Sequence, residues 1–202
     1  MNLTIKRIFD LIIVILSFPI LFILFFIIFL LILILDLHFP LFFQLRSGYK
    51  QKNFTLVKFK TMKNLKDKNN IILPDEKRVT KLGIFLRSTS LDELPTIYNV
   101  FFGNMSIVGP RPLLVEYNKL YNEHQIKRFN VKPGITGLAQ INGRNSLTWD
   151  EKFSYDIKYV NKNNLITDII IIIKTLVIVI KKKNINQFNK IGSQKFQGNK
   201  NE

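Results

Sequence analysis

The chain has 202 residues, enough for one catalytic-sized domain, and carries 30 Lys and Arg against 14 Asp and Glu, a formal net charge of +16. This surplus points to polyanionic partners: nucleic acid, phosphorylated substrates or an anionic membrane surface. The lack of cysteine excludes disulfides, zinc–thiolate sites and a cysteine nucleophile, and the two histidines stand too far apart for ligand-like spacing. A metal would need carboxylate and phosphate oxygens, which suits Mg²⁺.

The first distinctive element is an uncharged apolar run between Asp10 and Asp36, "LIIVILSFPILFILFFIIFLLILIL". As a straight helix it would be about 37 Å long, enough to cross a hydrocarbon layer of ~30 Å, and it is too long for a signal-peptide core. It therefore predicts a retained membrane segment. Basic residues stand on both sides of the run, so both flanks favour the cytoplasm. Pro19, two residues after Ser17, leaves open a re-entrant helix and a single span with a kinked first third.

Two short apolar segments follow, "FPLFFQL" and "FTLVKFKTM", and they predict a β-hairpin closed by a Gly-containing loop. On the second strand Lys58 and Lys60 would share one face, opposite Val57 and Phe59. The polar stretch "NLKDKNNIILPDEKRV" predicts a surface excursion. Helical spacing of apolar residues returns in "LDELPTIYNVFF", which predicts a helix that begins near Ser90.

Two adjacent carboxylates, Asp92 and Glu93, stand at the start of that helix. One interpretation is structural, because Ser90 to Glu93 fits the S-x-x-E capping box. The other is chemical: adjacent residues do not share a helix face, so the two acids should have different roles. Neighbouring cations and a helix N-terminus would keep Asp92 ionised as a nucleophile, while Mg²⁺ neutralises a diphosphate.

Two stiff turns come next, and each carries an arginine. In "GPRP" two prolines flank Arg111, which would present its guanidinium to phosphate oxygens; the alternative is a rigid loop with an exposed arginine. In "VKPGITGLAQINGRN" glycines would let backbone N–H groups approach an anion beside Arg144; the alternative is a pair of turns joining helices. Between the turns, "VEYNKLYNEHQIKRF" predicts an exposed helix.

A second apolar segment, "NLITDIIIIIKTLVIVIKKKN", is interrupted by Asp168 and Lys174. Its uncharged pieces are too short to span a bilayer, so it predicts an interfacial helix whose final lysines, 181–183, meet anionic headgroups. A buried core helix is the alternative. The last residues are rich in Lys and Asn and predict a poorly ordered tail.

Taken in order, the motifs "IKRIFD", "FQLRSG", "VKFKTM", "LRSTSLDELP", "NMSIVGPRPLLVEY", "VKPGITGLAQINGRN" and "KFSYDIKYV" closely resemble the bacterial sugar transferase family, the monotopic polyprenyl-phosphate phosphoglycosyl transferases, and within it the short PglC-type enzymes. The resemblance runs from about Lys6 to Ile180. It implies an α+β, mostly helical, membrane-monotopic fold with an N-terminal re-entrant helix, interfacial amphipathic helices and a small β-hairpin. The expected parts are a membrane helix over 1–36, a catalytic domain over 37–183 and a polar tail over 184–202.

The resemblance also implies a reaction at the cytoplasmic face of the bacterial inner membrane. Asp92 would attack the sugar-bearing phosphate of a UDP-sugar, release UMP and pass the phosphosugar to undecaprenyl phosphate. Glu93 would assist in Mg²⁺ binding, which both carboxylates would share, or in acid–base work. The family's basic positions imply phosphate or nucleotide contacts at Lys60, Arg87, Arg111 and Arg144. The PglC-type likeness favours an N-acetylated amino sugar, and the implied partners are UDP-sugar, undecaprenyl phosphate, inner-membrane lipid and downstream glycosyltransferases.

Two positions depart from the family's pattern. The family's Ser-Pro kink would fall near Ile23, whereas this chain has Ser17-Phe18-Pro19 about one helical turn earlier. Leu138 stands where close relatives often carry Trp. We therefore expect a shifted bend in the membrane helix.

Two other function classes compete with this expectation. A basic membrane-anchored protein could bind acidic lipid or nucleic acid without catalysis, but the aromatic residues lie mostly inside apolar runs and form no stacking platform, so no nucleic-acid partner is expected. A catalytically inactive scaffold of the same family is disfavoured by the intact Asp92 and Glu93.

Overall fold

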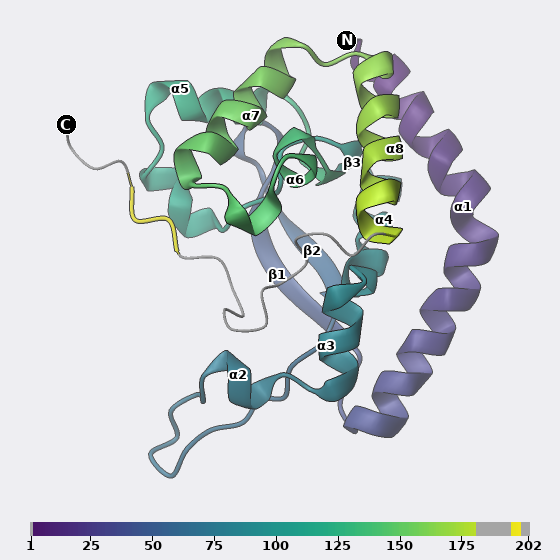
Figure 1. Ribbon diagram of the computed structural model, residues 1–202, viewed down its shortest axis with the longest axis vertical. Helices are drawn as coiled ribbons and strands as arrows, with labels where there is room; N and C mark the ends of the chain where they lie inside the picture. Colours follow the sequence, from purple (N-terminus) through teal and green to yellow (C-terminus); the bar gives the residue numbers. More distant parts are fainter. Residues whose placement is uncertain (1, 181–194, 199–202) are drawn as a thin grey trace.

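The structure, a computed structural model, describes residues 2–180 and 195–198. A long N-terminal helix lies along one side of a mixed body of short helices and two small sheets (Figure 1). The helix comprises α1 (Leu3–Leu31) and a π-helical turn, η1 (Ile32–Asp36). The later elements are β1 (Leu41–Ser47), η2 (Tyr49–Gln51), β2 (Asn53–Phe59), α2 (Asp75–Arg78), α3 (Lys81–Ser88), η3 (Leu91–Thr96), α4 (Ile97–Phe101), β3 (Ser106–Val108), η4 (Val115–Lys119), α5 (Glu123–Ile126), η5 (Lys127–Asn130), β4 (Gly134–Thr136), α6 (Leu138–Ile141), η6 (Arg144–Ser146), α7 (Trp149–Asn161) and α8 (Leu165–Ile180).

Helix α1 begins at a side-chain cap and continues without a break through its proline. The Asn2 carboxamide oxygen accepts from the Thr4 N–H at 2.8 Å, and the helix ends where Leu37 adopts a left-handed φ of 55°. Pro19 lies inside the helix, which bows outward from the body (Figure 1). Within the described residues, the segment Leu3–Asp36 is the one helix long and apolar enough to cross a membrane.

The N-terminal end of α1 is fixed to the body by buried charge. The Lys6 ammonium lies 2.6 Å from the Asp168 carboxylate of α8. The buried Asp10 carboxylate accepts from the Ser106 hydroxyl at 3.0 Å and from the Ile107 N–H at 3.1 Å. A buried carboxylate needs such donors because desolvation would otherwise be costly.

The C-terminal end of the same helix contacts the same body. Ile28 and Ile32 are buried in a cluster with Phe59 and Leu86. Asp36 accepts from the Thr80 hydroxyl at 2.8 Å, and Thr80 in turn caps α3 by accepting from the Gly83 N–H. Both ends of the long apolar helix are therefore held by one compact unit.

The predicted β-hairpin is confirmed. Strands β1 and β2 pair antiparallel from Leu41 opposite Phe59 to Ser47 opposite Asn53, around a loop that contains Gly48. The β2 side chains of Phe54, Leu56 and Phe59 are buried, whereas Lys58 is only partly covered. Lys60 lies one residue beyond the strand, so the strand itself carries only one of the two lysines.

The two predicted stiff turns contain a second sheet. Strands β3 and β4 pair in parallel, with Ser106 opposite Gly134 and Val108 opposite Thr136. A Cβ atom on Gly134 would lie 2.1 Å from the Gly109 nitrogen, and one on Gly137 would lie 2.2 Å from the Gly109 oxygen. The Gly109 N–H pairs with Thr136, and the Gly134 N–H pairs with Pro110. These glycines permit close chain packing, so the expectation that their amides approach an anion is wrong for Gly134.

The prediction of one exposed helix between the turns is wrong. Residues 115–130 form the three short segments η4, α5 and η5. The side chains of Tyr117, Tyr121 and Phe129 are buried in an aromatic cluster with Phe153 and Phe196. Phe196 belongs to the predicted polar tail, most of which lies outside the described residues. Tertiary packing of aromatic side chains outweighs helical continuity here.

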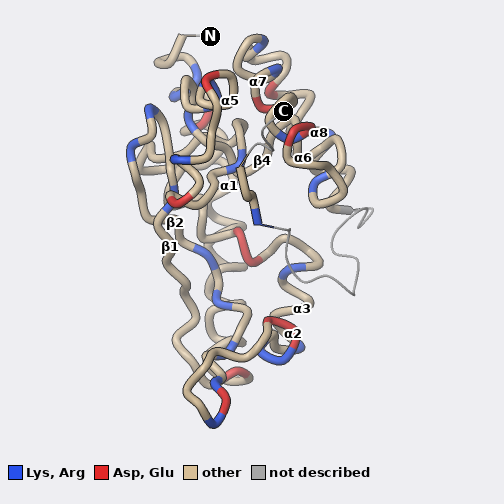
Figure 2. Tube along the Cα trace, turned by 90° about the vertical axis from the view of Figure 1, so that its left-hand side faces the viewer, with Lys and Arg blue, Asp and Glu red and all other residues tan. Residues whose placement is uncertain are grey.

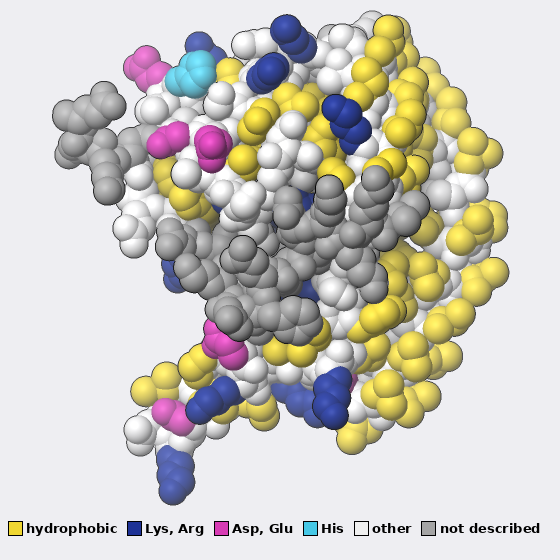
Figure 3. All heavy atoms as spheres, in the orientation of Figure 1, with side chains coloured by type: hydrophobic (Ala, Val, Ile, Leu, Met, Phe, Trp, Pro, Cys, Tyr) yellow, Lys and Arg dark blue, Asp and Glu magenta, His cyan; other side chains and the backbone are white. Residues whose placement is uncertain are grey.

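Helix α8 has one buried face and one exposed apolar face. Asp168 and Ile171 are buried, whereas Ile166 is 72% and Ile173 is 56% exposed. Apolar side chains of α1 and α8 cover one side of the molecule in Figure 3. This arrangement agrees with the interfacial helix and is not that of a fully buried core helix; Lys181 to Lys183 lie outside the described residues.

We expect both ends of the long helix to be accessible from the same side of a membrane, because both contact one body. The native chain lacks cysteine, so Leu3→Cys and Leu37→Cys, at exposed positions, can be labelled singly with an impermeant maleimide on each side of sealed vesicles. Both should react from one side. Ile20→Cys, at the exposed middle of the helix, is the control and should react only in detergent. Labelling of the two ends from opposite sides would refute this topology.

Candidate active site

The adjacent acids lie on a tight 3₁₀ turn, η3, directly after α3. Ser90 adopts a left-handed φ of 59° and its side chain makes no cap. The Glu93 side chain turns away from the turn and toward β2 and the loop after β3. The predicted capping box is therefore wrong, because two cations compete successfully for the carboxylate that would have closed it. The predicted helix exists, but it begins as this turn and becomes α-helical at Ile97.

Glu93 is the centre of the site. Its Oε1 accepts from Lys58 Nζ at 2.5 Å and from Arg111 Nη2 at 2.6 Å, and Oε2 accepts from Arg111 Nη1 at 3.4 Å. Burial disfavours the charge of Glu93, but the cations of Arg111 and Lys58 hold its pKa well below the ordinary value. Glu93 is thus an ionised bridge between three segments of the chain.

Asp92 has a different environment. Its carboxylate has no hydrogen bond or ion pair to another residue in the described part of the chain. Burial raises the pKa of Asp92 to about 6, and the negative charge of Glu93 adds to the rise against Lys58, Arg111 and Arg87. The nearby cations do favour the ionised form of Asp92, as expected, but burial and the charge of Glu93 outweigh them, so the pKa of Asp92 is raised overall. Different roles for the two acids remain a consistent interpretation.

The Arg111 loop is rigid for a reason that the two prolines only partly reveal. Pro110 and Pro112 are buried, and Arg111 itself is half exposed. The buried Arg128 donates to the Arg111 carbonyl at 2.7 Å and is itself paired with Asp156 at 2.8 Å. This second ion pair fixes the backbone that presents Arg111.

The other predicted basic residues, Arg87, Arg144 and Lys60, differ in their contacts and in their electrostatic influence on the acids. Arg87 donates from Nε to the Thr61 hydroxyl at 2.8 Å, and its charge lowers the pKa of Asp92. Arg144 lies on η6 within the electrostatic reach of Glu93 and Arg111, and burial lowers its pKa. Lys60 pairs its backbone N–H with Pro40, and its side chain has no hydrogen bond or ion pair among the described residues.

Two residues of the site were not in the predicted set. The alternation of residues along the strand predicts the face on which Lys58 lies. It does not predict the pairing of Lys58 with Glu93, which depends on how the hairpin packs against η3. Arg46 of β1 lines a small cavity of about 20 Å³ together with Lys58, Glu93 and Arg111. Burial, with the charge of Arg111, lowers the pKa of Arg46 to about 10, and its buried Nε has no partner among the described residues. A buried, unpaired guanidinium N–H suits an anionic ligand.

Among the described residues no group of three or more His, Cys, Asp or Glu side chains could hold a metal ion. Any metal at this site would therefore be bound by only one or two carboxylates.

The charged residues of the whole molecule are unevenly represented. Lys and Arg are distributed over the hairpin and the helices of the body, and Asp and Glu are few (Figure 2).

The comparisons with known proteins decide the family. The model of the bacterial sugar transferase family matches residues 1–182. The chain belongs to the bacterial sugar transferase family. The resemblance seen in the motifs is thereby confirmed at the level of the family.

Several curated relatives share this module. The chain is 47% identical over 160 residues to the uncharacterized sugar transferase EpsL of Bacillus subtilis (strain 168), covering 79% of each chain. It is 42% identical over 154 residues to the galactosyl transferase CpsE of Streptococcus agalactiae serotype III (strain NEM316), covering 69% of this chain and 34% of the relative. It is 38% identical over 189 residues to a UDP-glucose:undecaprenyl-phosphate glucose-1-phosphate transferase of Klebsiella pneumoniae, covering 87% of this chain and 40% of the relative. The last two relatives are therefore much longer than the shared module.

We expect Lys58→Met to lower the free energy of unfolding by about 1–3 kcal/mol, because the partly buried Glu93 carboxylate then loses a donor. Lys60→Met is the matched control, with the same chemical change two residues away, and should change stability by less than about 0.5 kcal/mol. Thermal or urea unfolding in detergent measures both. Equal effects of the two variants would contradict the assignment of Lys58 to the site.

Proposed function

We propose that the protein transfers a sugar-1-phosphate from a UDP-sugar to undecaprenyl phosphate, with Asp92 as the nucleophile. The observation that carries the proposal is the position of Asp92, whose carboxylate has no partner among the described residues and lies next to Glu93, which holds the cations of Lys58 and Arg111. Membership of a sugar transferase family and an exposed apolar helix support the same conclusion. The name of the relative from Klebsiella pneumoniae supports the acceptor and the UDP donor.

The reaction has two displacements. An Asp92 carboxylate oxygen attacks the sugar-bearing phosphorus, the bond from that phosphorus to the bridging oxygen breaks, and UMP leaves with the electron pair. A phosphate oxygen of undecaprenyl phosphate then attacks the same phosphorus, and the bond to the aspartyl oxygen breaks. This step restores the Asp92 carboxylate and leaves the sugar on a polyprenyl diphosphate.

The basic residues of the site would stabilise the phosphate oxygens during both steps. Arg111 is half exposed and held by Glu93 and Arg128, so its guanidinium is pre-oriented. Arg87 uses only Nε on Thr61, and no partner of its terminal nitrogens lies among the described residues. Lys60 and Arg144 are the further predicted phosphate or nucleotide contacts. Arg46 lines the same small cavity and offers a buried Nε–H that has no partner among the described residues.

Magnesium fits this donor set in part. Proteins bind Mg²⁺ through one or two carboxylates, with phosphates and water as the other ligands. Asp92 has no competing partner among the described residues, whereas Glu93 Oε1 already accepts two hydrogen bonds. Mg²⁺ would therefore be held chiefly by Asp92, with Glu93 contributing, and would supply positive charge to the diphosphate when bound.

The location that suits this chemistry is the cytoplasmic face of the bacterial inner membrane, with the long helix re-entrant. Basic flanks on both sides of the apolar run and attachment of both helix ends to one body support this orientation. The donor sugar is proposed to be an N-acetylated amino sugar, from the PglC-type likeness. Glucose and galactose, which the names of several relatives give, are the competing donors.

The central test is a panel of UDP-sugars with undecaprenyl phosphate and Mg²⁺. Purified protein should release UMP with at least one donor, and Asp92→Asn should reduce that rate by at least about 10³-fold, because an amide is not a competent nucleophile here. Asp150→Asn, an exposed acid on α7, is the control and should retain activity. UMP release that persists in Asp92→Asn, or its absence with every donor, would overturn the mechanism.

The pH dependence provides an independent check. Because the pKa of Asp92 is about 6, the rate of UMP release should fall as pH decreases through about 6, where the nucleophile becomes protonated. Unfolding free energies are less informative, because the two acids act in opposite directions: the raised pKa of Asp92 favours the folded state at low pH, whereas the lowered pKa of Glu93 favours it at higher pH. Glu93→Gln should move the acidic limb to lower pH. A rate that stays flat to pH 5 would argue against Asp92.

A further inference from the structure

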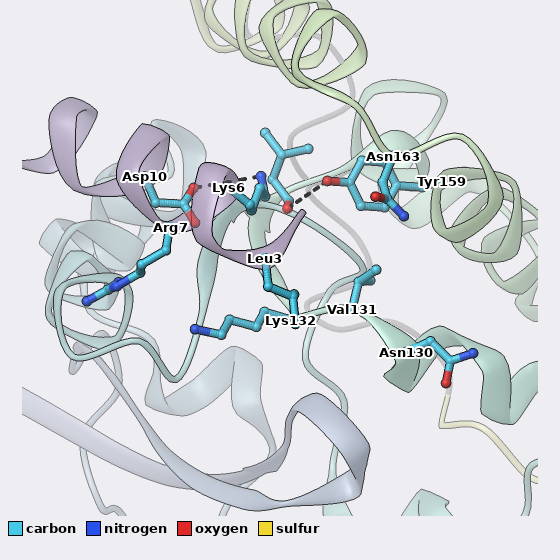
Figure 4. A pocket seen from close by; sticks show the side chains of 10 residues that line it. Leu3, Lys6, Arg7, Asp10, Asn130, Val131, Lys132, Tyr159 and Asn163 are labelled. Atoms are coloured by element: carbon cyan, nitrogen blue, oxygen red, sulfur yellow. Dashed lines mark hydrogen bonds and ion pairs between the residues drawn. The ribbon is translucent and has the colours of Figure 1, made fainter. Parts of the chain in front are cut away.

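A second cavity lies away from the acids, beside the N-terminal end of α1. It has a volume of about 170 Å³ and is bounded by the first turns of α1, by Val108, by residues 130–132 and by the end of α7 (Figure 4). It shares no lining residue with the cavity around Glu93. The family site therefore does not account for it.

Among the described residues, two of the three basic side chains at this cavity, Arg7 and Lys132, form no ion pair with a carboxylate. Lys6 is neutralised by Asp168 at 2.6 Å and Asp10 at 3.7 Å. Arg7 instead donates to the carbonyl oxygens of Val100 and Phe101, which orient the guanidinium without removing its charge.

Lys132 is the second cation without a carboxylate partner. Its ammonium has no hydrogen bond or ion pair to another residue in the described ranges. Burial lowers the pKa of Lys132, and the positive charge of Arg7 lowers it further, against a smaller opposing effect of the Asp10 carboxylate. An anion bound between Lys132 and Arg7 would offset both the burial of the Lys132 charge and the repulsion between the two cations.

The two cations converge on one glycine. A Cβ atom on Gly103 would lie 3.4 Å from Lys132 Nζ and 3.6 Å from Arg7 Cζ. Gly103 has a φ of 81°, which other residues rarely adopt, so the position also stays open. In Figure 4 the Arg7 and Lys132 side chains reach toward the same side of the cavity.

Exposed apolar side chains lie beside the two cations. Leu3 lines the cavity and is 54% exposed, and Phe101 and Phe102, which directly precede Gly103, are exposed next to it. Apolar side chains contribute nothing to the binding of a free inorganic anion. A lipid, in contrast, carries a phosphate directly beside hydrocarbon that such side chains can contact. Charge and apolar surface are therefore matched to an amphiphile.

We propose that Arg7 and Lys132 bind the phosphate of an anionic phospholipid headgroup, at a site separate from the one that holds the sugar donor. The inference rests on the membrane location given under the proposed function, but not on the transfer reaction. The bound lipid would hold the N-terminal end of α1 at the membrane surface.

The test measures lipid binding by the full-length protein in neutral detergent. Dihexanoyl-phosphatidylglycerol is titrated while the melting temperature is followed, and native mass spectrometry counts the bound lipid. We expect a saturable rise of the melting temperature, binding at least tenfold weaker for dihexanoyl-phosphatidylcholine, and binding at least tenfold weaker for glycerol phosphate, which lacks the acyl chains. Equal binding of glycerol phosphate would mean a free-phosphate site and overturn the lipid assignment.

Charge variants locate the site. Lys132→Met should weaken phosphatidylglycerol binding by about tenfold or more, as expected for the loss of a charged hydrogen bond. Lys132→Arg should retain it, and Lys127→Met, an exposed lysine on η5, should stay within about twofold of the parent. Equal losses in Lys132→Met and Lys127→Met would refute the proposal.

The acceptor is the other phosphate-bearing lipid to distinguish. If Lys132→Met raised the KM for undecaprenyl phosphate and left phosphatidylglycerol binding unchanged, the site would belong to the acceptor and the proposal would fail. Because the binding titration contains no sugar donor, its failure would leave the transfer reaction standing, and failure of UMP release would leave the binding result standing.

Discussion

The structure of the site depends on the bridge that Glu93 makes between Lys58 and Arg111. Each partner comes from a different part of the chain: a hairpin strand, a 3₁₀ turn and a proline-bounded loop. Desolvation of such ions offsets much of their attraction, so the bridge is weak evidence for stability. Its value is positional, because one ionised oxygen fixes two cations and leaves the neighbouring carboxylate of Asp92 without a partner among the described residues.

The long helix is held by the same principle on a larger scale. Asp10 near one end and Asp36 at the other are buried and accept hydrogen bonds from the body, while most side chains between them are apolar and exposed. Exposure of that apolar surface to water would be unfavourable. Because one compact body contacts both ends of the helix, both ends must lie on the same side of a bilayer. The re-entrant arrangement proposed above would satisfy both conditions, and α1 bows outward from the body (Figure 1).

Local patterns predicted the features that depend on local physics. Alternation located the hairpin, hydrophobic length located α1, and the position of Asp92 and Glu93 on one turn follows from their adjacency. The errors have tertiary causes. Glu93 leaves the capping box for two distant cations, and residues 115–130 break into short segments because Tyr117, Tyr121 and Phe129 must reach one aromatic cluster. No spacing rule could pair Lys58 with Glu93, 35 residues away, or Arg128 with Asp156.

The glycine contacts between β3 and β4 have a mechanical consequence. Gly109 lies directly against Gly134 and Gly137, at separations where one added methyl group would collide with backbone. The segment that continues from Gly109 carries Arg111, and the segment that continues from Gly137 leads to Arg144. With no side chain between them to slide or rotate, the two segments form a single stiff unit. A displacement of one arginine loop by a bound phosphate would therefore be transmitted to the other, and the two guanidinium groups would advance or withdraw together.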